Sequence, residues 1–265
     1  MISKKQVGKL IPYPVIENGR KILNFGPTSC RVCGSGIRRL KDTGYGFPVL
    51  ERLQVVGGLR RFADACPVCH SSSRERLIWF WMSKANRGFR FAKDTTIAHF
   101  APEKGLSMQM ARCVGENYTA YDFEPSRYRH LKRVEQADLS NLTIKDDSVD
   151  LLVCNHVIEH VPNVGQSLAE IFRVTKPGGV AILQVPIALN LASTIELALD
   201  STAEERVDLL GQDDHLRLFT QDGYLGALEE AGFEVELFDP FEMSAKTATE
   251  WTLDPFEKLH ICRKP

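Results

Sequence analysis

The chain has 265 residues, of which 43% are hydrophobic and 25% are charged, the composition of an ordinary globular protein. No apolar run approaches the roughly 20 residues that span a bilayer, and the first residues hold lysines without the apolar stretch of a secretory signal. We therefore expect a cytoplasmic protein with no membrane segment.

The net charge of −1 conceals a strong asymmetry along the chain. Residues 1–93 carry 18 Lys and Arg against 5 Asp and Glu, a charge of +13, whereas residues 94–265 carry 15 against 29, a charge of −14. This predicts two domains with different partners, or two that attract each other. Within the basic domain we expect an arm at 1–29, a cysteine region at 30–69 and a linking helix at 73–86.

Four of the seven cysteines form two CxxC pairs, in CRVCGSG and CPVCHSSSR. Two intervening residues let one tight turn aim both sulfurs at a single ion, so Cys30, Cys33, Cys66 and Cys69 predict a structural zinc site. Disulfides and unrelated buried thiols are the alternatives. His70 adjoins the last cysteine and is interpreted as a bystander. The long spacer between the pairs predicts an inserted hairpin at RLQVVGGLRRF (52–62), and the apolar helix RERLIWFWMSK (74–84) is expected to pack between the domains.

From Thr95 onward, short apolar segments alternate with segments of helical spacing. Strands are predicted at TTIAHF (95–100), NYTAYD (117–122), VEQADL (134–139), SVDLLVCN (148–155), VAILQVP (180–186), FEVELF (233–238) and, antiparallel to its neighbour, EKLHICR (257–263). Helices are predicted at GLSMQMARCV (105–114), SRYRHLKRV (126–134), NVGQSLAEIFRVT (163–175) and QDGYLGALEEAGF (221–233). The alternation indicates an α/β fold, doubly wound around a mostly parallel sheet, with ligands beyond the carboxyl ends of the strands. Residues 187–214 are interpreted as a largely helical insertion that could act as a lid.

The run SVDLLVCNHVIEHVPNVGQSLAEIFRVTKPGGVAILQVP closely resembles class I S-adenosylmethionine-dependent methyltransferases of the type 11-like group. The resemblance covers roughly residues 95–263 and implies a Rossmann-like sheet of seven strands. The segment CPVCHSSSRER with the later HFAPEKG resembles a subset that carries an N-terminal zinc knuckle. The first loop departs from the family pattern, because only Gly105 stands where a GxGxG-like turn is usual.

The resemblance implies a binding site for S-adenosylmethionine. Asp122 matches the acid that accepts hydrogen bonds from the ribose hydroxyls. Phe123 matches the residue next to this acid, which could lie against the adenine. Asp138 and Leu139 match the pair at the adenine amino group. The other residues implied are Phe100, Ala101, Pro102, Glu103 (for the cofactor ammonium) and Gly105 in the first loop, and Asn155 beside the methionine part.

Two places in the sequence offer a general base, which would take a proton from the substrate that receives the methyl group. His156 follows the fourth strand, and His215 lies just after the insertion, where Arg217 could hold a carboxylate or phosphate of the substrate. Glu159 and His160 are interpreted as structural.

Three functions remain open from the sequence. The first is methyl transfer to an oxygen or nitrogen of a small-molecule or sugar acceptor, with the basic domain docked on the acidic one. The second is methyl transfer to RNA, which the basic domain would bind through arginine clusters and nearby aromatic residues. The third is an inactive methyltransferase-like interaction protein. The sequence favours the first.

Overall fold

The computed structural model of the chain describes residues 13–85, 89 and 91–265. Residues 1–12 of the predicted arm and the last residue of the predicted linking helix, Asn86, lie outside this part. The described chain contains no helix that is long and apolar enough to cross a membrane.

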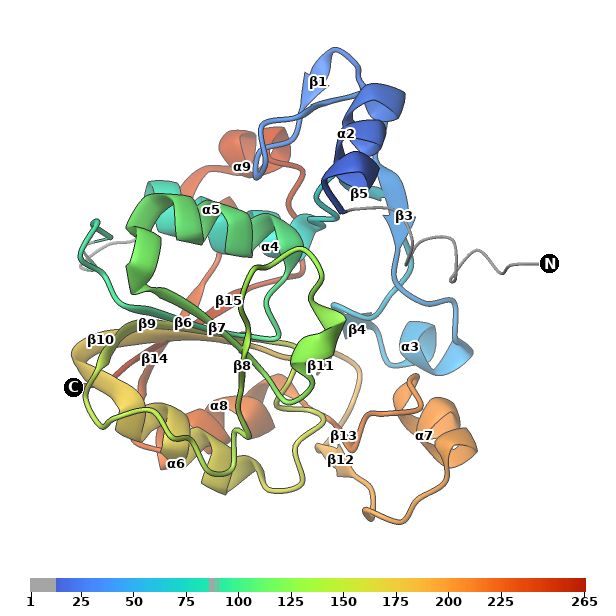
Figure 1. The fold of residues 1–265 in the computed structure, drawn as a ribbon. Coiled ribbons are helices and arrows are strands. Elements are labelled where there is room, and N and C mark those ends of the chain that lie inside the picture. The colour runs from blue at the N-terminus through green and yellow to red at the C-terminus, as the bar shows by residue number, and fades with distance from the viewer. Residues whose placement is uncertain (1–12, 86–88, 90) are drawn as a thin grey trace.

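The centre of the molecule is one sheet of seven strands with helices on both faces (Figure 1). The strand order is β14-β15-β10-β9-β6-β7-β8, and β15 is the single antiparallel member, between β10 and β14. The strands are β6 (Ile97–Phe100), β7 (Tyr118–Asp122), β8 (Glu135–Gln136), β9 (Val149–Asn155), β10 (Thr175–Gln184), β14 (Glu234–Phe238) and β15 (Leu259–Arg263). The predicted α/β fold, doubly wound around a mostly parallel sheet, is confirmed.

Helices α4, α5 and α9 cover one face of the sheet, and α6 and α8 cover the other (Figure 1). They comprise α4 (Ser73–Phe80) with the π-helical turn η1 (Trp81–Ala85), α5 (Lys104–Val114), α6 (Val164–Val174), α8 (Gln221–Glu230) and α9 (Pro240–Glu250). Short 3-10 turns lie at η2 (Gly115–Asn117) and η3 (Pro125–Arg127). Strand β9 is buried almost throughout because both faces are covered, which explains its continuous apolar sequence.

The helices differ from expectation at two places. The stretch 126–134 holds only the turn η3, which begins at Pro125, and the residues after it form turns and bends. Conversely, α9 was not expected from the sequence. It begins at Pro240, where Asp239 accepts a hydrogen bond from the backbone N–H of Phe241 at 2.8 Å, a favourable helix start.

The N-terminal elements lie at the carboxyl edge of the sheet and above it (Figure 1). They are α2 (Tyr13–Asn24), β1 (Thr28–Ser29), β2 (Gly36–Ile37), β3 (Lys41–Thr43), α3 (Pro48–Arg52), β4 (Val55–Val56) and β5 (Arg61–Ala65). The hairpin expected around Gly57 is wrong: β5 pairs with β3, and β4 pairs with β11 (Ile187–Ala188) in the insertion. The glycine pair turns the chain between two different sheets.

The insertion at 187–214 is less helical than expected. It contains β11, β12 (Ile195–Glu196) and one helix, α7 (Ala203–Leu210), and β12 pairs with β13 (Arg217–Leu218) beyond it. Because β11 is hydrogen-bonded to β4, the insertion is tied to the N-terminal elements at this point.

The linking helix α4 belongs to the main core, as well as joining the two parts of the chain. Its side chains Leu77, Ile78 and Phe80 are fully buried in the same cluster as strands β6, β9 and β10. Each such side chain contributes on the order of 1.5–3 kcal/mol by leaving water.

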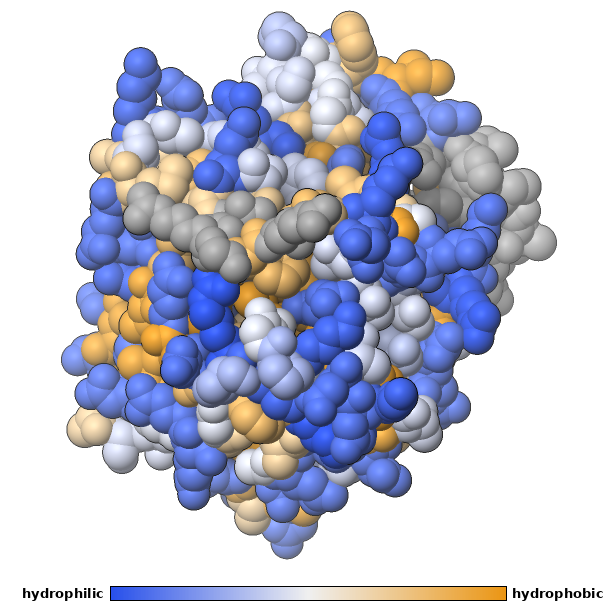
Figure 2. Space-filling view, turned by 90° about the vertical axis from the view of Figure 1, so that its left-hand side faces the viewer, coloured by the Kyte–Doolittle hydropathy of each residue, from blue (hydrophilic) through white to orange (hydrophobic). Residues whose placement is uncertain are grey.

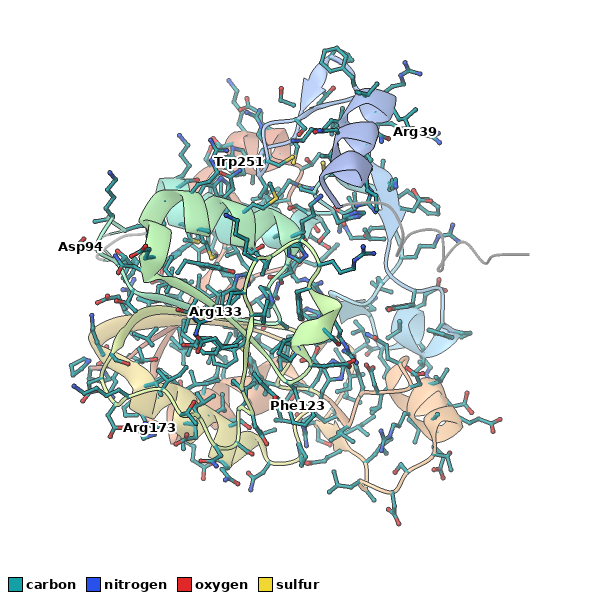
Figure 3. All side chains as sticks on the ribbon, viewed as in Figure 1. Arg39, Asp94, Phe123, Arg133, Arg173 and Trp251 are labelled. Carbon is teal, nitrogen blue, oxygen red and sulfur yellow. The ribbon has the colours of Figure 1, made fainter. Side chains whose placement is uncertain are left out.

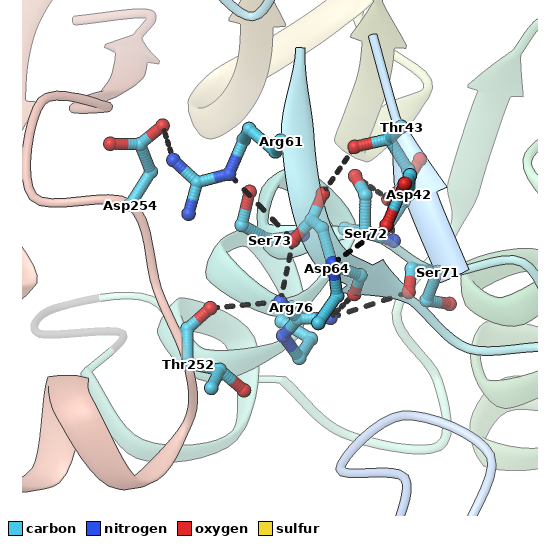
Figure 4. A network of polar contacts seen from close by, with 12 residues as sticks. Asp42, Thr43, Arg61, Asp64, Ser71, Ser72, Ser73, Arg76, Thr252 and Asp254 are labelled. Atoms are coloured by element: carbon cyan, nitrogen blue, oxygen red, sulfur yellow. Dashed lines mark hydrogen bonds and ion pairs between the residues drawn. The ribbon is translucent and has the colours of Figure 1, made fainter. Parts of the chain in front are cut away.

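A buried arginine also holds the two parts of the chain together (Figure 4). Arg76 is 3% exposed, and its guanidinium donates to Asp64 Oδ1 at 2.8 Å and to the carbonyl oxygens of Trp251 and Thr252 at 2.9 and 2.8 Å. Arg61 forms an ion pair with Asp254 beside it. Part of the basic character of residues 1–93 therefore neutralises the acidic part of the same chain.

The surface at the far end of the sheet from these elements is mostly hydrophilic, with hydrophobic residues in small separate groups (Figure 2).

Candidate functional site

A cavity of about 630 Å³ opens at the carboxyl ends of β6, β7 and β8. Each of these strands ends in residues that face it, because carboxyl ends of parallel strands meet at one edge of a sheet. Of the expected cofactor residues, the cavity is lined by Phe100, Ala101, Asp122, Phe123, Asp138 and Leu139.

Asp122 is held rigidly at the end of β7. Its Oδ1 accepts from the backbone N–H of Glu124 at 2.7 Å, and its Oδ2 accepts from the hydroxyl of Tyr128 at 2.6 Å. A carboxylate has about four acceptor positions, so two stay available for ligand hydroxyls. Tyr128 also lines the cavity, and the sequence analysis missed it because it placed this tyrosine on a helix.

The other four expected cofactor residues do not line this cavity: Pro102, Glu103, Gly105 and Asn155. Glu103 instead accepts hydrogen bonds from His99 Nε2 at 2.8 Å and from Asn155 Nδ2. Burial acts to raise the pKa of Glu103, but the hydrogen bond from His99 and the charges nearby outweigh it and hold the pKa below its ordinary value. Glu103 is therefore an ionised group that braces β6 against β9.

Gly105 faces the cysteine cluster. A Cβ at this position would lie 2.0 Å from Ser71 Oγ and 3.3 Å from Cys69 Sγ. The small residue is required by the cysteine region packed on the first turn of α5.

A second cavity, of about 540 Å³, lies between the N-terminal elements and the carboxyl edge of the sheet. Its wall is strongly polar, with arginine, carboxylate, histidine, serine and threonine side chains. His156, His160 and Asp214 line both this cavity and the first one, so the two cavities share a wall.

The expected proton acceptors both line the second cavity. His156 has a left-handed backbone with φ of 54°, and its Nδ1 lies 3.4 Å from Glu159 Oε1. Burial and the nearby Arg74 lower the pKa of His156 well below its ordinary value. Burial, together with His160, lowers the pKa of His215 to about 4. Both imidazoles are therefore neutral near pH 7.

Glu159 lies between these histidines, is fully buried, and has no hydrogen-bond partner for either carboxylate oxygen within the described residues. Burial raises its pKa to about 7. The sequence pattern favoured structural roles for Glu159 and His160. The sequence did not predict that these two residues lie close to His215, because His215 is 55 positions beyond His160.

Arg217 does not line either cavity, which corrects its expected role as a substrate ligand. It is 1% exposed, and its guanidinium donates to the carbonyl oxygens of Ile158 and Val161 at 3.1 and 2.6 Å and to Glu196 Oε1 at 2.8 Å. It therefore positions the loop that follows β9. The arginines that line the second cavity are Arg61 and Arg74, and Glu257, whose pKa burial raises to about 7, lines it as well.

The four cysteines come together as expected. The Sγ atoms of Cys30 and Cys69 are 3.7 Å apart and those of Cys33 and Cys66 are 4.0 Å apart. A tetrahedral zinc ion with Zn–S bonds of about 2.3 Å separates its sulfurs by about 3.8 Å, so the cluster has the right size for the metal.

Both CxxC turns have the same local structure. The backbone N–H of Gly34 donates to the carbonyl of Cys30, and that of His70 to the carbonyl of Cys66, each at 2.9 Å. Gly34 and His70 both have a left-handed φ, of 71° and 67°. His70 thus closes a turn and also lines the second cavity.

Comparison with known proteins is consistent with this arrangement. Residues 100–183, about a third of the chain, match the family described as "Methyltransferase domain". A probable S-adenosylmethionine-dependent methyltransferase of Mycolicibacterium smegmatis is 26% identical over 139 residues, and an uncharacterized methyltransferase of Mycobacterium ulcerans is 43% identical over 58 residues. The alignments cover 50% and 22% of this chain, and the chain spans about half of the first relative and about a quarter of the second.

Among solved structures, a S-adenosylmethionine-dependent methyltransferase from Mesorhizobium loti has a TM-score of 0.47 at 17% identity, with 68% of this chain and 95% of that one covered. The [4+2]-cyclase SpnF has a TM-score of 0.49 at 14% identity, with 91% and 98% covered. The family match runs from the end of β6 to β10, the part of the sheet whose carboxyl edge borders the cavities.

Proposed function

We propose that this protein transfers a methyl group from S-adenosylmethionine to an oxygen or nitrogen atom of a small polar acceptor, such as a sugar. The observation that carries the proposal is the pair of adjoining cavities that share His156, His160 and Asp214 as a wall. One cavity has the acids and apolar residues suited to a nucleoside, and the other has a polar wall suited to a hydroxylated molecule.

The residues of the first cavity fit the cofactor. Asp122 offers free acceptor positions for the ribose hydroxyls, and Asp138 with Leu139 offers an acid and an apolar contact for the adenine. The cofactor supplies an activated methyl group when it is bound. The chain's part is to hold the acceptor in line with that group, and positioning of this kind can supply on the order of 7–11 kcal/mol.

The residues of the second cavity fit a polar acceptor. Arg74 offers donors for a carboxylate, phosphate or hydroxyl group. His156 and His215 also line this cavity, and His156 lines the first cavity as well. The N-terminal elements supply much of the wall, so we propose that the zinc-bound cysteine region shapes the acceptor cavity.

Substitution of Asp122 by Asn tests the cofactor site. We expect the affinity for S-adenosylhomocysteine, measured by calorimetry, to fall about 10- to 100-fold, because hydrogen bonds to a charged group contribute about 1.5–3 kcal/mol. Asp200→Asn, at an exposed position, is the matched control and should bind like the unchanged protein. Equal binding by both variants would exclude Asp122 from the site, and no binding by the unchanged protein would favour the inactive interaction protein.

An RNA acceptor is the second candidate, and one surface observation favours it. The guanidinium of Arg60 lies 4.9 Å from the ring centre of Phe62, which is 72% exposed, and such a pair can stack on bases. Arg39 points outward from the N-terminal elements, away from Phe123 at the first cavity (Figure 3). Against RNA stands the burial of Arg76 and the pairing of Arg61.

A transfer assay separates the two candidates. Radiolabelled S-adenosylmethionine would be incubated with sugars and hydroxylated metabolites in one series and with RNA in another. Label in a small acceptor supports the first candidate. Label in RNA, with binding that weakens steeply as salt rises, supports the second.

A further inference from the structure

Three side chains from two distant parts of the chain surround one point in the wall of the second cavity. A carboxylate oxygen of Glu159 and one imidazole nitrogen each of His160 and His215 all lie within 4.8 Å of one another. Glu159 Oε1 is 3.9 Å from His160 Nε2 and 4.0 Å from His215 Nε2. These separations are too long for hydrogen bonds.

The cluster has unmet bonding capacity at full burial. Glu159 is 0% exposed and His215 is 2% exposed, and neither oxygen of Glu159 has a hydrogen-bond partner within the described chain. Leaving such groups unsatisfied costs on the order of 1–3 kcal/mol each, and more when they are charged. A cation between the three ligand atoms would satisfy them together.

The distances suit a metal ion. Bonds of about 2.0–2.2 Å in a tetrahedral site place ligand atoms about 3.3–3.6 Å apart, slightly closer than the separations observed here. Small rotations of the two imidazoles would bring the ligands to these distances.

The surroundings orient the ligands. His160 Nδ1 lies 3.0 Å from the carbonyl oxygen of Asp214, so this nitrogen carries the proton and Nε2 presents its lone pair to Glu159. A carbonyl partner on the second ring nitrogen is the usual support of a metal-binding histidine. The backbone N–H of Leu216 donates to the carbonyl of Glu159 at 3.0 Å, and Arg217 donates to Ile158 and Val161. These bonds hold the two ligand-bearing segments side by side.

We propose that Glu159, His160 and His215 bind one divalent transition-metal ion, whose open positions hold a hydroxyl-bearing acceptor. The inference rests on the proposed function for the identity of the acceptor, but the metal site stands on its own geometry. Two imidazoles and one carboxylate favour Zn²⁺, Mn²⁺ or Fe²⁺ over Mg²⁺, which prefers oxygen ligands. Three protein ligands leave positions free, and these face the second cavity.

This site changes the role of His215. A metal ligand cannot also accept a proton in the reaction, so His215 becomes a residue that places the acceptor. His156 lies 3.4 Å from Glu159 on the side shared with the first cavity and remains available to the acceptor.

The test counts metal ions. The unchanged protein, loaded with Zn²⁺ and Mn²⁺ and then desalted, should retain one more divalent ion per chain by mass spectrometry than Glu159→Gln or His215→Ala. Any ion held by the cysteine cluster is present in all of these proteins, so it does not affect the difference in metal count. His130→Ala is the matched control for loss of an imidazole and should retain the same number as the unchanged protein.

The outcomes separate this inference from the proposed function. Equal metal counts in the unchanged protein, Glu159→Gln and His215→Ala overturn the metal site, even when S-adenosylhomocysteine binds. One ion fewer in these two variants supports the site, even when S-adenosylhomocysteine does not bind. If a variant loses its folded circular dichroism spectrum, the unchanged protein is loaded with one equivalent of Zn²⁺, which the four thiolates take up first, and Mn²⁺ binding is then followed by electron paramagnetic resonance. About one bound Mn²⁺ per chain supports the site, and none overturns it.

Discussion

Among single residues, a buried histidine makes the stability of this protein depend on pH. His260 on β15 is 1% exposed and uses both ring nitrogens, with Nδ1 2.7 Å from Gln184 Oε1 and Nε2 2.9 Å from Gln221 Nε2. One nitrogen donates to an oxygen and the other accepts from an amide, which is the pattern of a neutral ring. Burial lowers the pKa of His260 to about 4.

Substitution of His260 by Gln should therefore reduce the loss of stability in acid. Between pH 6.5 and 4 the unfolded chain binds a proton on this ring that the folded chain does not bind, so the free energy of unfolding falls as the pH falls. From pH 7 to pH 5 this ring contributes a loss of about 2 kcal/mol. Urea unfolding at both pH values should show a loss smaller by about this amount in His260→Gln, and an equal loss in both proteins would contradict the assignment.

Among the elements, the short strand β4 leads into a turn that contacts the site. It pairs with β11, with Val56 opposite Ile187 and Val55 opposite Ala188, and the turn that follows it covers His156. Gly57 has a φ of 84°, and a Cβ there would lie 2.9 Å from His156 Cε1. The N-terminal elements thereby set the position of a side chain that follows β9.

Gly57→Ala should slow methyl transfer about 10-fold or more and leave the affinity for S-adenosylhomocysteine within about twofold, because a small displacement of a reacting group is costly. The left-handed backbone should also lower the free energy of unfolding by about 1 kcal/mol. Gly46→Ala is the matched control, since a Cβ there meets nothing within 4 Å. If both variants transfer methyl groups at the same rate, the turn does not position His156.

Across the whole molecule, the cysteine cluster packs on the sheet edge that carries the first cavity. Lys104 Nζ donates to the carbonyl of Val68 at 2.9 Å, and Gly105 packs against Ser71 and Cys69. Both contacts are made by the first turn of α5, which follows the loop beyond β6. The cysteine cluster and the start of α5 therefore fold against each other.

Cys66→Ser should remove the zinc ion, lower the melting temperature by about 10 °C or more, and weaken S-adenosylhomocysteine binding about 10-fold. The reason is that the start of α5 loses the surface on which it packs. Metal analysis, thermal unfolding and calorimetry measure the three effects. Cys113→Ser changes a thiol outside the cluster and should alter none of them. If the Cys66→Ser protein lacks zinc but binds S-adenosylhomocysteine with normal affinity, cofactor binding does not depend on the cysteine cluster.

Local patterns were sufficient to predict the sheet and the cysteine cluster. Apolar runs such as 148–155 and 180–186 predict buried strands because each strand needs only its own residues to be apolar, and the CxxC spacing defines a turn within four residues. The family resemblance, and not these patterns, supplied the expected cofactor residues, and six of them line the first cavity.

Contacts between distant segments were decided only by the tertiary structure. The pairing of β4 with β11, the packing of Gly105 on the cysteines and the meeting of Glu159 with His215 each join residues far apart in the chain. Arg217 has the chemistry of a substrate ligand in the sequence, but folding buries it among backbone carbonyls. A sequence states which groups a residue can offer, whereas burial and packing determine which partner it meets, because those depend on the whole chain at once.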